Sequence, residues 1–218
     1  MARLNQRVWN NSSLTVKTKL HVYQACVLST LLYSSEAWTT YAIHEKRLNS
    51  FHLRCLRRIL HIKWQDKVPN VEVLERASIK SMFAILSERR LRWLGHVRRM
   101  ESGRIPKDLL YGELAVGSRP AGRPRLRFRD VCSRDLKRCN ISTSTWENRA
   151  ENRAAWRLTV RQGTQRAEDE RNAALALKRA KRKKPLQQPQ QATTHKCRTC
   201  GRDCHSRVGL HSHTRKCR

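Results

Sequence analysis

Apolar residues in the first hundred positions recur at helical spacing and predict a series of packed helices. The stretch from Lys17 to Ala37 is rich in Leu, Val, Tyr and Cys, which is typical of a deeply packed helical segment. A second helix is predicted from Ile43 to Ile62, because its apolar residues share one face and its arginines another. The apolar face consists of Leu48, Phe51, Cys55, Leu56, Ile59 and Ile62, and the basic face of Arg47, Arg54, Arg57 and Arg58.

A proline break separates this helix from the next two. Val68-Pro69-Asn70 ends the second helix, and Asn70 is an N-cap candidate for a short helix from Val71 to Ala77. Ser78 is the N-cap candidate for a third long helix, whose arginines we place on or near its polar side. Its apolar positions, which we attribute to core packing, are Ile79, Met82, Phe83, Leu86, Trp93, Leu94 and Val97, and its arginines are Arg89, Arg90, Arg92, Arg98 and Arg99.

The second half of the chain mixes loops with shorter helices. Glycines and prolines make it irregular between Glu101 and Asp130, and a helix is predicted from Phe128 to Cys139. Thr145 is expected to cap a segment that contains two tryptophans. From Gly163 onward Arg, Ala, Glu and Lys dominate, which predicts an exposed helix that ends in a basic run. The run consists of Lys178, Arg179, Lys181, Arg182, Lys183 and Lys184.

The end of the chain has the spacing of a zinc site. Cys197 and Cys200 form a Cys-x2-Cys pair, and His213 and Cys217 follow one helical turn apart, as a tetrahedral Zn²⁺ site requires. Such a segment is too small to fold on an apolar core, so bound Zn²⁺ would supply its folding energy. The alternative is a disulfide-bonded tail, which needs an oxidising compartment.

This array resembles a C2H2-type finger whose fourth ligand is Cys217 in place of His. Leu210 stands where a ββα finger buries an apolar residue, whereas Cys204 stands where that fold usually has an aromatic residue. Cys204, His205 and His211 are close enough in sequence to replace one of the ligands. The pattern predicts the ligand set Cys197, Cys200, His213 and Cys217 but leaves these substitutes open.

These patterns predict a mostly α protein, an irregular basic helical bundle joined by a flexible linker to a small ββα-like zinc finger. We expect a helical region at 1–100, a loop-rich and helical extension at 101–160, a basic helix and linker at 161–196, and the finger at 197–218. Three glutamines around Pro189 make 185–191 the linker.

The charge of the chain indicates a polyanionic partner. Its 218 residues include 47 Lys and Arg against 17 Asp and Glu, a net charge of +30. An excess of this size favours the phosphate backbone of DNA or RNA, the alternative being a solvated basic surface with no dedicated ligand. No apolar run is long enough for a membrane span, and we expect no small-molecule substrate. The basic run at 178–184 favours a nuclear location, a phosphate-binding arm or both.

The finger is predicted to contact phosphates and not to read bases. Ser206, Gly209 and Ser212 occupy the helix positions that usually face bases, and none offers a bidentate contact to guanine or adenine. Its basic side chains suit phosphate oxygens instead, and these are Arg198, Arg202, Arg207, Arg215 and Lys216. The Gly-Arg-Pro sequence within Arg119–Arg125 is a weaker candidate for a minor-groove arm, and a connecting loop is the simpler interpretation.

Residues with catalytic chemistry are sparse. Four cysteines outside the finger have no His or metal-type partner nearby in sequence, so we interpret them as small buried apolar residues. They are Cys26, Cys55, Cys132 and Cys139. Phosphoryl transfer by two metals needs clustered carboxylates, and the chain has few.

Four stretches of the chain carry a family resemblance. They are Lys19–Leu28, Leu31–Trp38, Leu91–Met100, and Gly122–Arg125 with Phe128–Asp130. Together they resemble the region downstream of the polymerase palm in non-LTR (LINE-type) retrotransposon reverse transcriptases, many of which also end in a Cys/His knuckle. The resemblance implies that residues 17–100 are similar to a thumb-like region that grips template and primer.

The resemblance does not extend to polymerase activity. The catalytic carboxylates of that family lie in an aromatic-x-Asp-Asp motif, and this chain has no Asp-Asp pair. We therefore expect a non-enzymatic, sequence-tolerant nucleic-acid-binding fragment. The alternatives are a subdomain that works with a separate palm-containing chain, a zinc-dependent protein-interaction module, and a partly folded relic.

Overall fold

The computed structural model describes residues 4–112, 122, 124–183, 195–204 and 206–217. It is mostly helical and ends in a two-stranded hairpin with one helix, which confirms the predicted fold class. The chain divides into two compact units, Met1–Ala174 and Leu175–Arg218. In the part of the chain that is described, no helix is long and apolar enough to cross a membrane.

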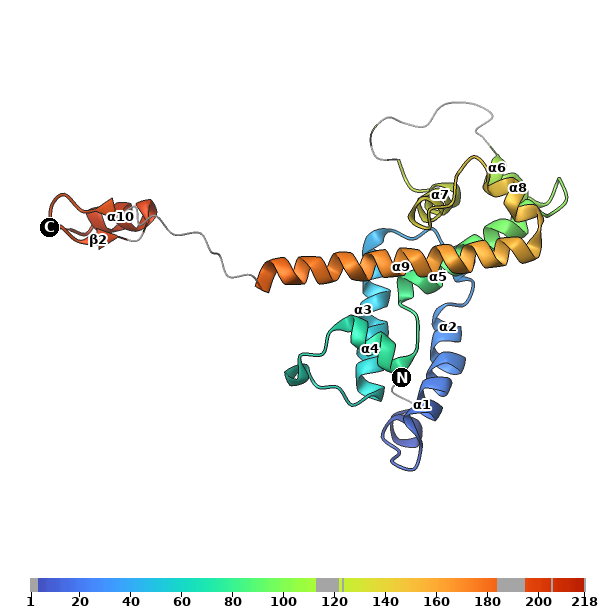
Figure 1. Cartoon of the computed structure of the whole chain (residues 1–218), viewed down its shortest axis with the longest axis horizontal. Helices are drawn as coiled ribbons and strands as arrows, with labels where there is room; N and C mark the ends of the chain where they lie inside the picture. The colour runs from blue at the N-terminus through green and yellow to red at the C-terminus, as the bar shows by residue number, and fades with distance from the viewer. Residues whose placement is uncertain (1–3, 113–121, 123, 184–194, 205, 218) are drawn as a thin grey trace. The chain divides into compact units, whose positions relative to one another are not determined.

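Helices make up the first unit, and the last of them, α9, continues past Ala174 into the second unit (Figure 1). In chain order the described elements are η2 (Asn5–Trp9), α1 (Val16–Val22), η3 (Tyr23–Leu28), α2 (Ser29–Leu31), η4 (Ser35–Ala37), α3 (Ala42–Ile59), η5 (Trp64–Asp66), α4 (Asn70–Ala77), α5 (Met82–Arg98), α6 (Ile105–Tyr111), α7 (Phe128–Arg138), α8 (Trp146–Glu151) and α9 (Arg153–Lys183). The remaining elements are β1 (His195–Lys196), β2 (Asp203–Cys204) and α10 (Arg207–Thr214).

Helix α5 begins later than the sequence predicts. The N-cap is Ser81, whose hydroxyl accepts a hydrogen bond from the Ala84 N–H at 3.3 Å. Ser78, the predicted cap, instead ends α4 with a left-handed backbone at φ 51°. The prediction for Ser78 was therefore wrong, because Ser78 is used to close α4, where the N–H groups of Ser78 and Ile79 donate to carbonyls of the last turn. The N–H of Met82 donates to the side chain of Asn49 on α3 at 3.2 Å.

Helix α5 belongs to two hydrophobic cores, one on each half of its length. Met82 and Leu86 join a core that is built with α1, η3, α3 and α4. Leu91, Leu94 and Val97 join a second core with α6, α7, α8 and α9. In Figure 1, α5 accordingly runs between the group α1–α4 and the group α6–α8. The long central helix is thus the element that connects the two halves of the first unit.

The first turns of α9 lie directly against α5. Trp156 is buried, and its indole N–H donates to the carbonyl of Leu91 at 2.9 Å. Gly95 makes this approach possible, because a Cβ at that position would lie 2.1 Å from the indole nitrogen of Trp156. The helix begins at Arg153, ahead of the segment from Gly163 that was predicted to be an exposed helix. Its first turns join the second core through Trp156 and Val160, whereas most residues from Gln165 to Arg182 are exposed, as predicted.

A buried charge network joins the two cores. The Nε of Arg90 on α5 donates to Asp135 on α7 at 2.7 Å, and its terminal nitrogens donate to Glu45 on α3 and to Thr40, at 3.0 and 2.9 Å. The side chains of Arg90, Asp135 and Glu45 are at most 2% exposed. Arg90 was predicted to lie on or near the polar side of its helix, and its burial shows that this prediction was wrong.

Glu45 remains ionised at this buried position because cations surround it. Burial alone would raise the pKa of Glu45, but Arg90, the hydroxyl of Thr40, Arg134 and Arg138 together hold it below its ordinary value. The nearest nitrogens of Arg134 and Arg138 lie 3.1 and 3.5 Å from its carboxylate.

His52 makes the stability of the first core depend on pH. It is fully buried, with Nδ1 2.8 Å from the Tyr23 hydroxyl and Nε2 3.2 Å from the Lys80 carbonyl. A neutral ring satisfies both contacts by accepting from Tyr23 and donating to Lys80. Burial lowers the pKa of His52 to about 4, although the Lys80 carbonyl opposes the shift.

We therefore expect acid to weaken the fold well above pH 4. Between pH 6.5 and 4 the unfolded chain binds a proton on His52 that the folded chain does not, so stability falls as the pH falls. The loss attributable to His52 is about 2 kcal/mol between pH 7.5 and 5.0, measured as the free energy of urea unfolding. His52→Gln should flatten this dependence, whereas His44→Gln, at an exposed position, should not. Equal slopes in the wild type and in His52→Gln would contradict the assignment.

Candidate metal centre

A short hairpin presents the first two cysteines of the terminal unit. β1 and β2 pair antiparallel, with His195 opposite Cys204. The N–H of Cys197 donates to Arg202 and the N–H of Gly201 donates to the Cys197 carbonyl, both at 2.9 Å. Gly201 adopts φ 73°, a left-handed conformation that favours glycine. The resulting tight turn places Cys197 and Cys200 side by side.

The terminal helix presents the other two candidate ligands. Ser206 caps α10, its hydroxyl accepting from the Gly209 N–H at 3.0 Å. His213 lies in the last turn, and the Cys217 N–H donates to the His213 carbonyl at 2.8 Å. This helical spacing brings His213 and Cys217 to the same side, one turn apart.

The four predicted ligands converge on one point. One ligand atom from each of Cys197, Cys200, His213 and Cys217 lies within 4.8 Å of the other three. The sulfurs of Cys197 and Cys217 are 3.9 Å apart, and the Cys200 sulfur is 3.0 Å from Nε2 of His213. Tetrahedral Zn²⁺ with Zn–S bonds of about 2.3 Å requires sulfurs about 3.8 Å apart. Three thiols and one imidazole at these separations could hold such an ion.

The substitutes that the sequence left open do not join this group. Cys204 and His211 are described and lie outside the four-residue cluster, and His205 lies outside the described residues. Cys204 instead faces the helix, because a Cβ on Gly209 would lie 3.9 Å from the Cys204 Cβ.

The thiols of this group differ in acidity. The N–H groups of Cys200 and Thr199 point at the Cys197 sulfur and lower its pKa to about 6. The Cys217 pKa is raised to about 11, first by its hydrogen bond with Cys200 and then by burial and the Cys197 thiol. Backbone N–H groups aimed at a sulfur stabilise thiolate, which is the form that binds a metal.

The predicted phosphate-binding residues of the finger are all at its surface. Arg198, Arg202, Arg207, Arg215 and Lys216 are exposed. Of the three positions that usually face bases, Ser206 uses its hydroxyl to cap α10 and Gly209 has no side chain. The finger therefore presents cations and few groups that could recognise a base.

The predicted basic run falls mostly on the last turns of α9. Four of its side chains are exposed, and these are Lys178, Arg179, Lys181 and Arg182. Lys183 is the last residue of α9, and Lys184 lies outside the described residues. Most of the candidate arm at 119–125 and the linker at 185–191 also lie outside them.

The cysteines outside the finger follow the prediction at three positions. Cys55, Cys132 and Cys139 are buried, and burial raises the pKa of Cys139 to about 12. Cys26 is exposed, so the prediction that it is buried was wrong.

One group of cations was not singled out by sequence reasoning. Arg92 on α5 and Arg99 directly after it lie around the same cavity as Arg153 and Arg157 on α9. The two pairs are far apart in the sequence, and no spacing motif connects them.

The chain is distantly homologous to one curated protein. It is 23% identical over 155 residues to an uncharacterized transposon-derived protein of Caenorhabditis elegans, a match that covers 68% of this chain and 56% of that protein. The chain thus spans about half the length of this relative. No family model matches the chain. No solved structure matches it at a significant level.

Proposed function

We propose that this chain is a zinc-binding, sequence-tolerant nucleic-acid-binding fragment of a non-LTR retrotransposon polymerase. The observation that carries the proposal is the Cys3His cluster set in a small unit whose surface is strongly basic. Zinc would hold the finger in shape, and the cations around it would neutralise phosphates of DNA or RNA. The net charge of +30 supports the same activity, and we propose a nuclear location for the chain.

The finger supports an anchoring role in preference to base recognition. Cys197, Cys200, His213 and Cys217 would hold Zn²⁺ and so fix the hairpin against α10, and four protein ligands are typical of a structural site and not of a catalytic one. Arg198 and Arg202 extend from the hairpin, and Arg207, Arg215 and Lys216 from α10 and its end. Such contacts position a protein on a nucleic acid without reading its sequence.

The polymerase origin rests on the sequence resemblance together with the transposon-derived relative. The Leu91–Met100 string, which carries much of that resemblance, forms most of the second half of α5. Without an Asp-Asp pair, the chain would contribute binding and no catalysis. The same features support a second candidate, a subdomain that works with a separate palm-containing chain.

Salt dependence is the direct test of this proposal. If the chain neutralises six or more phosphates, its affinity for a labelled oligonucleotide should fall about a thousandfold between roughly 50 and 200 mM salt. Fluorescence anisotropy of the zinc-loaded full chain measures this, with oligonucleotides of different base composition giving similar affinities. Equal binding at low and high salt would contradict the electrostatic basis. A zinc-loaded chain that binds no oligonucleotide would favour the protein-interaction alternative.

A further inference from the structure

An arginine-lined cavity lies between α5 and the beginning of α9, within the first unit. Its volume is about 510 Å³, within the range of pockets that hold small organic ligands, roughly 300–1,000 Å³. Among the described residues, five arginines from α5, its C-terminal end and α9 line it, and Glu36 is the one acid of the lining. Trp93 and His96 also line the cavity.

Few of these charges are balanced by the protein. Arg89 uses its guanidinium for the Leu32 carbonyl, the Ser35 hydroxyl and Glu36, at 2.7, 3.3 and 3.9 Å. Arg99 donates to the Ala150 carbonyl. Among the described residues, Arg92, Arg153 and Arg157 have no hydrogen-bond or ion-pair partner. The acid of the cavity is thus already engaged, and three exposed guanidinium groups remain available.

The crowding of like charges is unfavourable without an anion. The pKa of Arg99 is lowered by burial and then by the nearby charges of Arg153 and Arg157. Trp156 holds α9 against α5 through its bond to Leu91, so these arginines cannot relax apart by separation of the helices. A bound polyanion would convert this repulsion into attraction, and guanidinium groups bind phosphate oxygens in a bidentate manner.

We propose that this cavity binds the phosphate backbone of a single-stranded nucleic-acid segment. The inference rests on the proposed nucleic-acid function and assigns it a second site, outside the zinc finger. Several guanidinium groups suit more than one phosphate, and the volume exceeds what one phosphate fills. The rings of Trp93 and His96, with centroids 5.2 Å apart, offer flat faces against which an unpaired base can stack.

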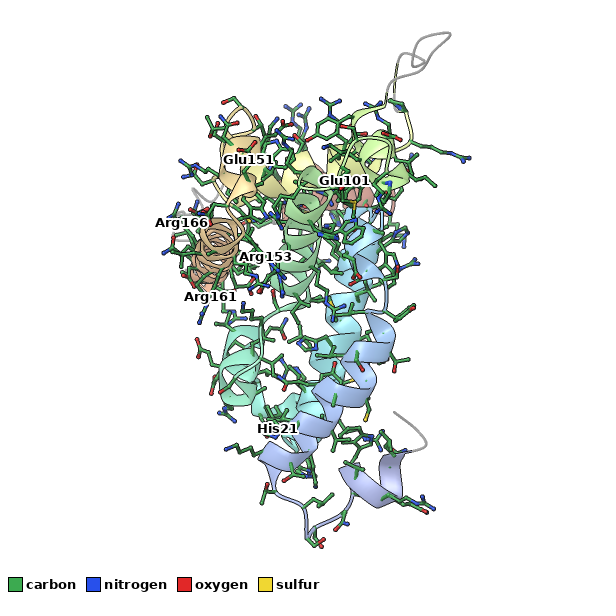
Figure 2. The ribbon with its side chains drawn as sticks, turned by 90° about the vertical axis from the view of Figure 1, so that its right-hand side faces the viewer. His21, Glu101, Glu151, Arg153, Arg161 and Arg166 are labelled. Carbon is green, nitrogen blue, oxygen red and sulfur yellow. The ribbon has the colours of Figure 1, made fainter. Side chains whose placement is uncertain are left out.

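Two matched double variants test the site. Figure 2 looks along α9 and shows Arg153 on the side toward α5, with Arg161 and Arg166 on other sides of the helix. Arg153→Ala/Arg157→Ala and Arg161→Ala/Arg166→Ala remove the same charge from exposed positions of one helix, and only the first pair lines the cavity. The probe is a labelled single-stranded oligonucleotide, measured by anisotropy with the zinc-loaded full chain.

The cavity pair should weaken binding about tenfold or more near 0.1 M salt and reduce the slope of log affinity against log salt by about 1.4. The control pair should weaken it less than about threefold, since screening limits charges that touch no phosphate. Arg92→Ala, on the opposite wall, should also weaken binding. If the two double variants weakened binding equally, the cavity would not be the binding site. The proposed function would still stand in that case, provided that the wild type binds the oligonucleotide in a salt-dependent manner.

Two further outcomes would overturn the choice of ligand. If duplex competes as well as single strand and loses the same affinity in the cavity variant, the single-strand assignment is wrong. If inorganic triphosphate binds the wild type, fails to bind the cavity variant, and oligonucleotide affinity is unchanged, the ligand is a free phosphate compound. If the wild type bound no oligonucleotide at all, the proposed nucleic-acid-binding function itself would be wrong.

Discussion

Cys200→Ser is expected to abolish metal binding and unfold the terminal finger, residues 195–217. Of the described residues in this segment, Cys197 alone is buried, Leu210 is half-buried, and Val208 is 76% exposed. A segment without an apolar core has no other source of stability to replace the metal. Zinc binding contributes about 10–16 kcal/mol in comparable peptides, which is the free energy of folding itself.

The measurement is zinc content of the full chain together with amide hydrogen exchange of the finger. The variant should contain no stoichiometric zinc, and its finger amides should exchange as fast as in the chelated wild type. Thermal unfolding of the first unit, Met1–Ala174, should not change, because its two cores contain no residue of the finger.

Cys204→Ser is the matched control. It removes a thiol from the same segment, and Cys204 lies outside the four-residue group. Zinc content should stay at one per chain in this variant. If Cys204→Ser lost zinc and Cys200→Ser retained it, the ligand set given by the spacing would be wrong.

The finger was predictable from the sequence because its determinants are local. Two cysteines on a tight turn and a His–Cys pair at helical spacing can converge on only one side of a short hairpin-helix unit. The choice against Cys204 was not predictable, since it depends on Cys204 facing Gly209 across the small unit. Spacing alone allows that thiol to point either way.

The helical body was predictable as far as apolar periodicity reaches. The stripe of α3 and the proline break before α4 both follow from the residues themselves. The burial of Arg90 does not, because it depends on Glu45 and Asp135, which other helices bring to it. The four arginines of α5 look alike in sequence, and tertiary contacts decide which one is buried.

The arginine-lined cavity shows the same limit at larger separation. Arg92 lies in α5 and Arg153 in α9, and the contact between the helices depends on Gly95 admitting Trp156. A glycine within a helix signals close approach but does not identify what approaches. The sequence therefore contained the residues of this candidate site without indicating that they are neighbours.

Arg90→Met is expected to destabilise the first unit by about 3–5 kcal/mol at neutral pH. The substitution keeps apolar volume but leaves the carboxylates of Asp135 and Glu45 buried without their shared partner. Asp135 suffers most, because Arg90 supplies the hydrogen bond to its Oδ2. Among the described residues its Oδ1 has no hydrogen-bond partner, and Arg138 lies 3.7 Å from it. The free energy of urea unfolding of the full chain measures the loss.

Arg134→Ala provides the comparison. Arg134 also donates to Glu45, at 3.1 Å, but its side chain is 28% exposed and Glu45 keeps Arg90. Its removal should cost about 1 kcal/mol or less, as for partly solvated ion pairs. If Arg134→Ala lost as much stability as Arg90→Met, the attraction between Glu45 and its arginines, and not the burial of an unpaired charge, would explain the loss of stability in Arg90→Met.

The dependence on pH separates these two causes further. In the wild type the lowered pKa of Glu45 stabilises the fold at every pH above the ordinary pKa of a glutamate. This contribution is lost as the pH falls below that ordinary pKa and through the lowered pKa of the folded chain. In Arg90→Met burial is opposed by fewer cations, so the pKa of Glu45 rises and its protonation relieves the unpaired charge. The deficit of the variant should therefore shrink as the pH is lowered from 7 toward 4.5. Adding Asp135→Asn to Arg90→Met should recover part of the lost stability at pH 7, since it removes a buried charge. If no stability were recovered, lost packing and not unpaired charge would explain the effect of Arg90→Met.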